Sequence, residues 1–328
     1  MAVRDTDVDE SQTIQRRTGW RSVYRQLKQD LTARISLYIV LVVLVIGAYT
    51  FIDSYLSYLT FGRVPNYWFA EALPFFDHPN ALPPPGEAHT HLPPAFTAEG
   101  TWEHPLGTDP RGRDYLTRLI YGTQVSLMVG LVSTTIGAIG GTIIGSVSGY
   151  YGGRIDDVLM RIVETIFAIP ALILVIVITV FLSGGTTDIR YAVLAIGIVM
   201  IPIFSRIIRS NVLSVRELGY IEAAKAAGVR DRTIILRHVI PNSFAPIMVY
   251  WTLQIGGVIL IVAGLSFLGY GAQPPTADWG QMLNVSHDYM HSNIWLSIWP
   301  GLMIMFTIMG FNLLGDGLQD ALDPRINQ

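Results

Sequence analysis

Residues 35–52 read ISLYIVLVVLVIGAYTFI and contain no charged side chain. The hydrocarbon core of a bilayer is about 30 Å thick, so a helix of about 20 mostly apolar residues crosses it. This stretch is therefore predicted to be a membrane-spanning helix. The 34 residues before it are polar, and the run is too long for the core of a cleaved signal peptide, so the helix is expected to remain as an anchor.

Five more stretches have the same character. They are residues 119–153, 165–187, 191–205, 239–277 and 289–315. The first of these has room for one span only, and the stretch 191–205 is extended by flanking residues from Ile189 to Val212. The composition agrees, because 51% of the residues are hydrophobic and only 14% are charged, against about 25% charged in an average globular protein. The sequence thus predicts an all-α membrane protein with six transmembrane helices.

The distribution of Lys and Arg predicts the orientation, because positive residues near the ends of spans stay in the cytoplasm. Of the 22 such residues, 17 lie on the side of the two termini, and the other five are Arg63, Arg111, Arg113, Arg118 and Arg190. Both termini are therefore expected in the cytoplasm. The predicted parts are a cytoplasmic segment 1–34, a first span 35–58, an extracytoplasmic loop 59–118, a five-helix domain 119–316 containing a cytoplasmic segment 213–243, and a cytoplasmic tail 317–328.

Charge and cysteine content exclude several kinds of function. A net charge of -3 provides no basic field for binding nucleic acid. The absence of cysteine excludes disulfides and thiolate metal sites. Four histidines of the extracytoplasmic loop raise the alternative of a metal site, but they form no tight ligand pattern, so solvated histidines are preferred and no metal is predicted. These residues are His78, His89, His91 and His104.

The extracytoplasmic loop 59–118 contains ten of the 18 prolines. Proline lacks the amide N–H and breaks helices, so the loop is predicted to be irregular. Irregular backbone exposed to lipid does not occur, which places the loop outside the hydrocarbon. Its aromatic residues, such as Trp68 and Trp102, belong either to the membrane interface or to a contact with another protein.

The cytoplasmic segment 213–243 is predicted to fold. Ser214 and Glu217 have the spacing of a capping box, and the alanine-rich residues 222–227 favour a helix. Gly228 is expected to end this helix in the left-handed conformation, and Asp231 to cap a second helix that stops at Pro241. Two such helices would either dock in a groove of another protein or lie on the membrane surface.

Residues 222–242, EAAKAAGVRDRTIILRHVIPN, resemble the EAA motif of the permeases of ATP-binding cassette (ABC) importers. The matching positions are Glu222, Ala223, Ala224, Gly228, Ile240 and Pro241. His238 stands where the general motif has isoleucine, and Ile240 stands where it has leucine. The ending RHVIPN is instead similar to the dipeptide and oligopeptide branch, which also includes nickel and glutathione permeases.

Two further resemblances support this branch. The stretch HPLGTDPRGRD, residues 104–114, is similar to the signature before the second span of C-type peptide permeases. Its positions are Gly107, Thr108, Asp109, Gly112, Arg113 and Asp114. The stretch GYYGG, residues 149–153, resembles the second-to-third connection of the same permeases. Together the resemblances cover about residues 104–324 and imply a type I ABC importer permease fold.

The resemblance implies that the chain forms half of a pathway for dipeptides or oligopeptides across a prokaryotic plasma membrane. The implied partners are a second permease, two ATPase subunits and an extracytoplasmic binding protein. Glu222 would contact an ATPase subunit, Ala223 and Ala224 would permit its close approach, and Gly228 would make the turn. ATP and Mg would be bound by those partners, because no glycine precedes either lysine and the chain therefore has no Walker A motif. The chain itself is not expected to be an enzyme.

Two alternatives remain. One is a nickel or glutathione permease of the same family, and the other is a secondary transporter. A secondary transporter usually has ionisable groups near the bilayer midplane. No acidic or basic residue lies at the centre of a predicted span, which disfavours the second alternative.

Small residues and prolines give predictions within the spans. Glycines recur at every fourth residue of the second span and are predicted to let another helix approach closely. They are Gly137, Gly141, Gly145 and Gly149. Pro170, Pro202 and Pro300 lie within predicted spans and are candidates for kinks. Asp53 is expected at the external end of the first span, near the membrane interface.

Overall fold

The structure, a computed structural model, describes residues 30–73, 76–83, 90–186 and 188–322. Within these ranges the chain is helical and contains no strand, and one isolated β-bridge pairs Thr108 with Asp114. The predictions for residues 1–29, for residues 323–328 of the tail and for His89 lie outside the described residues.

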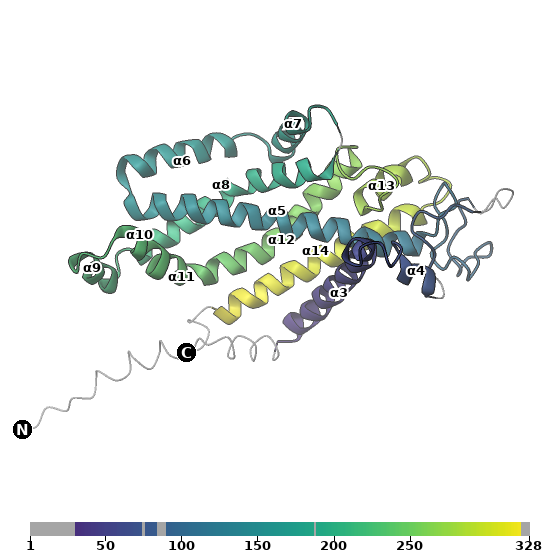
Figure 1. The fold of residues 1–328 in the computed structure, drawn as a ribbon, viewed down its shortest axis with the longest axis horizontal. Helices are drawn as coiled ribbons and strands as arrows, with labels where there is room; N and C mark the ends of the chain where they lie inside the picture. The colour runs from purple at the N-terminus through teal and green to yellow at the C-terminus, as the bar shows by residue number, and fades with distance from the viewer. Residues whose placement is uncertain (1–29, 74–75, 84–89, 187, 323–328) are drawn as a thin grey trace, which may run out of the picture.

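Among the described residues, five helices are long and apolar enough to cross a membrane. They are α3 (Leu31–Leu59), α5 (Tyr115–Tyr151), α8 (Ile189–Val215), α12 (Phe244–Phe267) and α14 (Trp295–Leu322). Figure 1 shows them gathered into one elongated bundle. A sixth span is present only if α6 (Gly153–Phe167) and α7 (Ala171–Ser183), which meet at 94°, are counted together. The all-α fold is confirmed, with five or six spans.

The prediction of a simple third span at residues 165–187 is wrong. Its residues are divided between the end of α6 and α7, and α7 has only 13 residues, about 20 Å at 1.5 Å per residue. The break lies at Pro170, the N-cap of α7. Proline has no N–H and disfavours the helical conformation of the residue before it. The connection after α5 is correspondingly short, a turn at Gly152 and Gly153, whose φ angles are +65° and +53°.

The fourth span is confirmed as a helix that includes the predicted flanking residues, since α8 runs from Ile189 to Val215. Pro202 lies inside α8 and Pro300 inside α14, and neither interrupts its helix. Of the three prolines, only Pro170 coincides with a break between helices.

Helices α5 and α8 approach each other along the four-residue glycine repeat. A Cβ atom on Gly137 would lie 2.4 Å from the Cβ of Met200, and one on Gly141 would lie 2.3 Å from the Cβ of Phe204. A Cβ on Gly145 would lie 2.5 Å from a carbonyl oxygen of α8, and one on Gly149 would lie 2.9 Å from the Cβ of Val212. Any side chain at these positions would therefore push the two helices apart.

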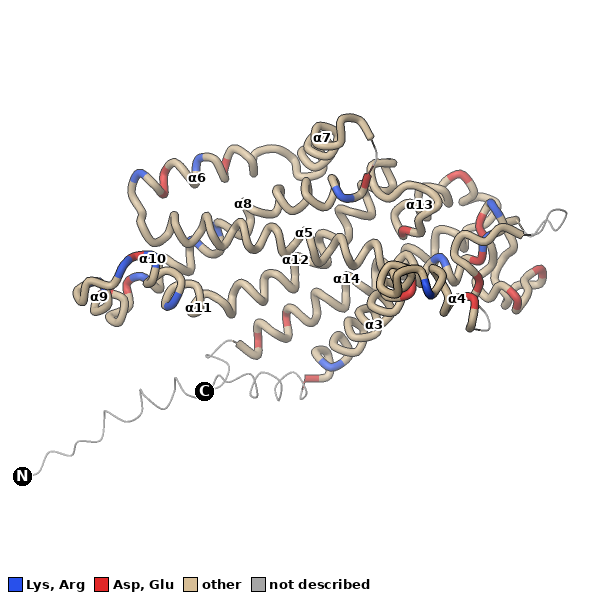
Figure 2. The backbone as a smooth tube through the Cα atoms, in the orientation of Figure 1, with Lys and Arg blue, Asp and Glu red and all other residues tan. Residues whose placement is uncertain are grey.

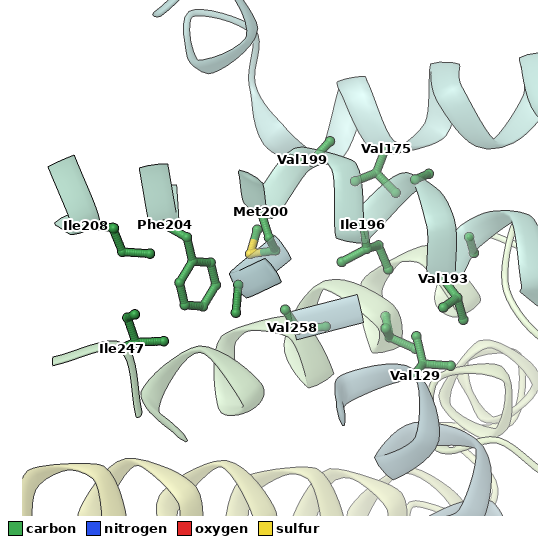
Figure 3. Packing of buried hydrophobic residues seen from close by; sticks show 14 of the residues in the cluster. Val129, Val175, Val193, Ile196, Val199, Met200, Phe204, Ile208, Ile247 and Val258 are labelled. Atoms are coloured by element: carbon green, nitrogen blue, oxygen red, sulfur yellow. The ribbon is translucent and has the colours of Figure 1, made fainter. Parts of the chain in front are cut away.

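The largest core cluster lies along this contact. Figure 3 shows side chains of four helices pointing into it, among them Val129 of α5, Val175 of α7, Phe204 of α8 and Val258 of α12. The same cluster continues to the short helices that follow α8, where it includes Ile221 and Ile234. The bundle and this segment therefore share one apolar core.

Asp53 lies near the end of α3, as expected, and its side chain is held within the protein. It is fully buried, and α3 continues beyond it to Leu59. Its carboxylate accepts hydrogen bonds from the Tyr121 hydroxyl and, at 3.0 Å, from the amide of Phe69. That amide belongs to α4 (Trp68–Ala72), so Asp53 attaches the start of the proline-rich loop to the bundle.

Candidate functional site

The EAA segment, defined as residues 219–242, forms the end of the molecule farthest from α4 and α13 (Trp279–His287) (Figure 1). Its first part is α9 (Gly219–Ala226). Ile221 is the buried residue of this helix, whereas Glu222 and Ala223 are exposed and Ala224 is half-buried. One face of α9 is thus fixed to the core, and a face of small side chains with one carboxylate is open.

Gly228 ends α9 through a Schellman motif. The amide of Gly228 donates to the carbonyl of Lys225 at 3.0 Å, and the amide of Val229 donates to the carbonyl of Ala224 at 3.1 Å. This pair of bonds is the defining pattern of the motif, in which the residue after the cap is left-handed. The φ angle of Gly228 is +75°, and no atom lies within 4 Å of the position of a Cβ. A side chain here would strain the backbone without clashing.

The second part of the EAA segment is a run of short helical pieces, α10 (Asp231–Ile234), the π-helix η1 (Ile235–Val239) and α11 (Ile240–Asn242). The amide of Ile240 bonds to the carbonyl of Ile235, five residues earlier. This wide turn comes directly before Pro241, whose ring would crowd a regular α-helical turn. Ile240 is half-buried and Pro241 is exposed, so the segment returns to the bundle just before α12.

Two capping predictions for this segment are wrong. Ser214 does not cap α9, because α8 extends through it to Val215, and the N-cap of α9 is Leu218 without a side-chain bond. Asp231 is the first residue of α10 rather than its cap. Its carboxylate instead accepts a hydrogen bond from the Tyr150 hydroxyl at 2.7 Å. At Asp231 a tertiary contact, which spacing does not reveal, takes the place of the local cap, and at Ser214 the longer α8 does.

The signature before the second span forms a buried ion-pair cluster at the opposite end of the bundle. Asp109 is 3% exposed and accepts bonds from the Arg113 guanidinium at 2.6 and 2.7 Å. The Nε of Arg118 lies 3.7 Å from the same oxygen. The other oxygen of Asp109 accepts the amides of Arg111 and Arg113 at 2.8 and 3.0 Å. This network closes the turn immediately before α5.

Asp114 begins α5. Its carboxylate accepts the amide of Thr117 at 2.7 Å and lies 3.0 Å from Nδ1 of His104. The hydrogen bond to Asp114 raises the pKa of His104 above its usual value. Thr108 is fully buried, and Gly107 and Gly112 have φ angles of +85° and +80°. The signature residues are thus brought together as one folded unit.

Several contacts in these sites are not predicted by the sequence pattern. Arg118 is predicted only as a charged residue of the loop side, yet it is 1% exposed and its Nη1 donates to the carbonyls of Pro79 and Pro275 at 3.0 and 3.2 Å. Asp278 is fully buried as the N-cap of α13, and burial raises the pKa of its carboxyl group. An aspartate directly before a helix-forming run is the one signal that could have indicated such a cap.

The loop histidines that the structure describes do not converge. His91 packs on the ring of Tyr289, His78 packs on Tyr67, and His104 bonds to Asp114. Within the described part of the chain, no group of three His, Cys, Asp or Glu residues could hold a metal ion.

Comparison with known proteins agrees with this arrangement. Residues 141–328 match the family described as binding-protein-dependent transport system inner membrane component. A dipeptide transport system permease protein of Alkalihalophilus pseudofirmus is 39% identical over 307 residues, which cover 94% of this chain and 90% of that protein. A glutathione transport system permease protein of Pectobacterium atrosepticum is 37% identical over 311 residues, which cover 94% and 92% of the two proteins.

A solved structure shows the same fold. An inward-facing form of the MetNI methionine ABC transporter aligns with a TM-score of 0.52 and 17% identity, over 63% of this chain and 97% of that chain. The family match covers more than half of the chain, and both relatives cover most of it. The chain therefore belongs to the family of binding-protein-dependent transport system inner membrane components, the permeases of ABC importers.

Proposed function

We propose that this chain forms half of the translocation pathway of an ATP-driven importer of dipeptides or oligopeptides, and that its EAA segment docks on an ATPase subunit. The observation that carries the proposal is the open face of α9, which presents Glu222 and Ala223 to solvent while Ile221 is buried beneath it. A helix held from one side and lined with small residues on the other can enter a groove closely.

The charge of this end supports docking over adsorption to the membrane. A helix that lies in the interface has a broad apolar face and basic residues on its polar face. The apolar residue Ile221 of α9 is already packed in the protein core, and the exposed face carries the acidic Glu222. Figure 2 shows both acidic and basic residues around α9 and α10. This mixed surface is suited to a protein partner.

The proposed assembly contains this chain, a second permease subunit, two ATPase subunits and an extracytoplasmic binding protein. ATP and Mg bind on the ATPase subunits, because neither Lys28 nor Lys225 follows a glycine as the phosphate-binding lysine of a Walker A motif does. In this assembly the chain moves substrate and couples to hydrolysis without performing it. Closure of the ATPases reaches the bundle as a rigid-body displacement of the EAA segment.

The proposed orientation places the EAA segment in the cytoplasm of a prokaryotic cell, with α4, α13 and the ion-pair cluster outside the plasma membrane. In Figure 1 the beginning of α3 and the end of α14 both point away from the α4 end. The first and the last described residues thus lie toward the end of the bundle that carries the EAA segment, which supports cytoplasmic termini.

Dipeptides and oligopeptides are the proposed substrates, and glutathione is the second candidate. The dipeptide relative is 39% identical and the glutathione relative 37% identical, so both support transport of short peptides. Membership in the permease family favours an ATP-driven importer over the alternative of a secondary transporter.

Affinity purification from native membranes in mild detergent tests the proposal, with mass spectrometry of every stoichiometric partner. We expect a second permease and P-loop ATPases to be recovered. Ala223→Arg should abolish recovery of the ATPases, because the arginine side chain covers the open face of α9 and prevents close approach. Ala98→Arg is the matched control, since Ala98 is an exposed alanine of the proline-rich loop. Recovery of equal ATPase with Ala223→Arg would contradict docking at this face.

The substrate is tested with the same assembly reconstituted in liposomes together with its binding protein. Uptake of radiolabelled alanyl-alanine is expected, and glutathione uptake alone would replace the dipeptide proposal with the second candidate.

A further inference from the structure

The EAA segment is joined to the bundle mainly through apolar contacts. Ile221, Ile234 and Val239 are each 0% exposed and lie in the main core cluster. Such contacts have little directional preference, since the hydrophobic effect depends on the area removed from water. They stabilise the segment against the bundle through the apolar area that they remove from water.

One residue of the bundle makes directional contacts with both halves of the segment. Tyr150 lies near the end of α5 and is 6% exposed. Its hydroxyl donates to Oδ1 of Asp231 in α10 at 2.7 Å. The Nζ of Lys225 in α9 lies 4.8 Å from the centre of its ring, within the range of a cation–π contact. A single side chain therefore contacts the segment on either side of the turn at Gly228.

The end of α5 that carries Tyr150 is itself held by neighbouring helices. The Nη1 of Arg216, at the end of α8, donates to the carbonyl of Gly149 at 3.0 Å. The hydroxyl of Ser148 bonds to Asp156 of α6, and Arg209 of α8 pairs with the same carboxylate at 2.5 and 2.6 Å. The end of α5 is thus attached to α6 and α8 by polar contacts. A displacement delivered to Tyr150 acts on three helices at once.

We propose that Tyr150 is the positioning residue that transmits displacement of the EAA segment to the bundle, through its bond to Asp231 and its contact with Lys225. This inference rests on the proposed docking of the segment on an ATPase subunit. Tyr150 does not touch the ATPase or the substrate. It fixes the angle between the segment and α5, so that tilting the segment tilts the helix.

The chemistry of the contact makes it separable from folding. Asp231 is exposed, so water replaces the phenol as hydrogen-bond donor when Tyr150 becomes phenylalanine, and no buried group is left unpaired. The phenylalanine ring keeps its place in the core and its contact with Lys225. Tyr150→Phe should therefore fold and insert normally.

The test uses the complete assembly with its ATPase subunits and binding protein, reconstituted in liposomes. The measured quantity is the uptake of radiolabelled alanyl-alanine and of glutathione per ATP hydrolysed. It is compared for Tyr150→Phe, Asp231→Ala and the double variant. Tyr151→Phe is the matched control, because Tyr151 is the neighbouring tyrosine, its ring is 5.3 Å from that of Tyr150, and it is exposed. Hydrogen exchange of the amides of residues 219–229 provides a readout that does not depend on the substrate.

Tyr150→Phe and Asp231→Ala are each expected to lower uptake per ATP roughly tenfold, the size of effect typical of one hydrogen bond to a charged group. The double variant should be no worse than either single one, because both remove the same bond. Exchange in residues 219–229 should be faster in these variants and unchanged in Tyr151→Phe, while ATPase subunits remain bound in all of them.

Normal uptake per ATP in Tyr150→Phe would overturn this inference and leave docking intact. Additive losses in the double variant would also overturn it, because the two residues would then act separately. Absence of ATPase subunits from the unaltered chain would overturn the proposed function itself, and this inference with it. Asp231→Ala changes only an exposed side chain, so the test stands even if a variant at position 150 fails to fold.

Discussion

The EAA segment and the signature at residues 104–114 lie at opposite ends of the bundle and are built in opposite ways. At one end, Asp109 and Arg118 are almost completely buried and bonded to their own chain. At the other end, Glu222 and Ala223 are exposed, and the segment is held by a few apolar residues and Tyr150. The signature at residues 104–114 therefore forms internal structure, whereas the EAA motif forms an open surface.

Mutations at the two ends should therefore have effects of different kinds. A residue whose partners are all internal contributes to folding, because its removal leaves buried groups without partners. Substitution of an exposed residue leaves no buried group without a partner, so under the proposed docking its effect should appear only in the assembly. Substitutions in the ion-pair cluster should lower stability, and those on α9 should alter coupling.

The largest effect is expected for Asp109→Ala. Removal of the carboxylate leaves the Arg113 and Arg118 guanidinium groups buried without their counter-ion, which costs about 3–5 kcal/mol. Thermal unfolding of the purified chain in detergent measures the loss. Glu164→Gln is the control, because its pair with Arg161 is exposed on both sides and such pairs contribute about 0–1 kcal/mol. Equal stability of the two variants would mean that the cluster is not structural.

A second prediction concerns the glycine contact between α5 and α8. Gly141→Ala should lower the free energy of unfolding by about 1–3 kcal/mol, because the added methyl group overpacks the contact. It would lie 2.3 Å from the Cβ of Phe204. Gly301→Ala in α14 is the matched control, with no atom within 4 Å of the new Cβ. That variant should be neutral or slightly stabilising, because alanine favours a helix more than glycine does. A comparable loss of stability there would mean that the loss at Gly141 does not come from the contact with α8.

Gly228→Val should cost less stability but impair coupling. A left-handed conformation costs a residue with a Cβ about 1–2 kcal/mol, and the open surroundings of Gly228 add no clash. We expect normal insertion and reduced uptake per ATP hydrolysed. Gly219→Val, at the start of the same helix and also in open space, should transport normally. Full coupling in Gly228→Val would show that the turn at this position is dispensable.

The smallest predicted effect is a pH dependence from His104. Its pKa is raised in the folded chain by Asp114, with Asp77 and Glu103 acting in the same direction. The resulting stabilisation is complete below the unfolded pKa of about 6.5 and is lost as the pH rises through the higher folded value. His104→Gln should flatten the pH dependence of thermal unfolding in this window. His291→Gln, an exposed histidine before α14, should leave it unchanged.

Much of the bundle could be predicted from the sequence because membrane solvation imposes long apolar helices. The apolar runs located α3, α8, α12 and α14, and the glycine spacing lies where α5 meets α8. Pro170 is one of the candidate kinks, and the bend between α6 and α7 lies there. The helix α6 before the bend was not predicted, because its charged residues resemble a connection. Hydropathy alone does not distinguish a charged helix beside a bundle from a loop.

The candidate sites were predicted in part. The end of α9 at Gly228 follows from one glycine after an alanine-rich run, which is a local signal. The roles of Tyr150, Asp231 and Arg118 depend on contacts between residues 39 to 157 positions apart. Local spacing suggested caps at Ser214 and Asp231 instead. Pairings of this range are not encoded in any short pattern.

The most direct measurement is crosslinking from the open face of α9. The chain contains no cysteine, so Ala223→Cys provides a single attachment point for a thiol-reactive photocrosslinker in native membranes. Arg63→Cys, which is exposed and lies just after the end of α3, is the control. We expect position 223 to crosslink to a P-loop ATPase. Position 63 should not crosslink to that ATPase. Crosslinks from position 223 to lipid alone, with the assembly intact, would contradict docking of the EAA segment on an ATPase.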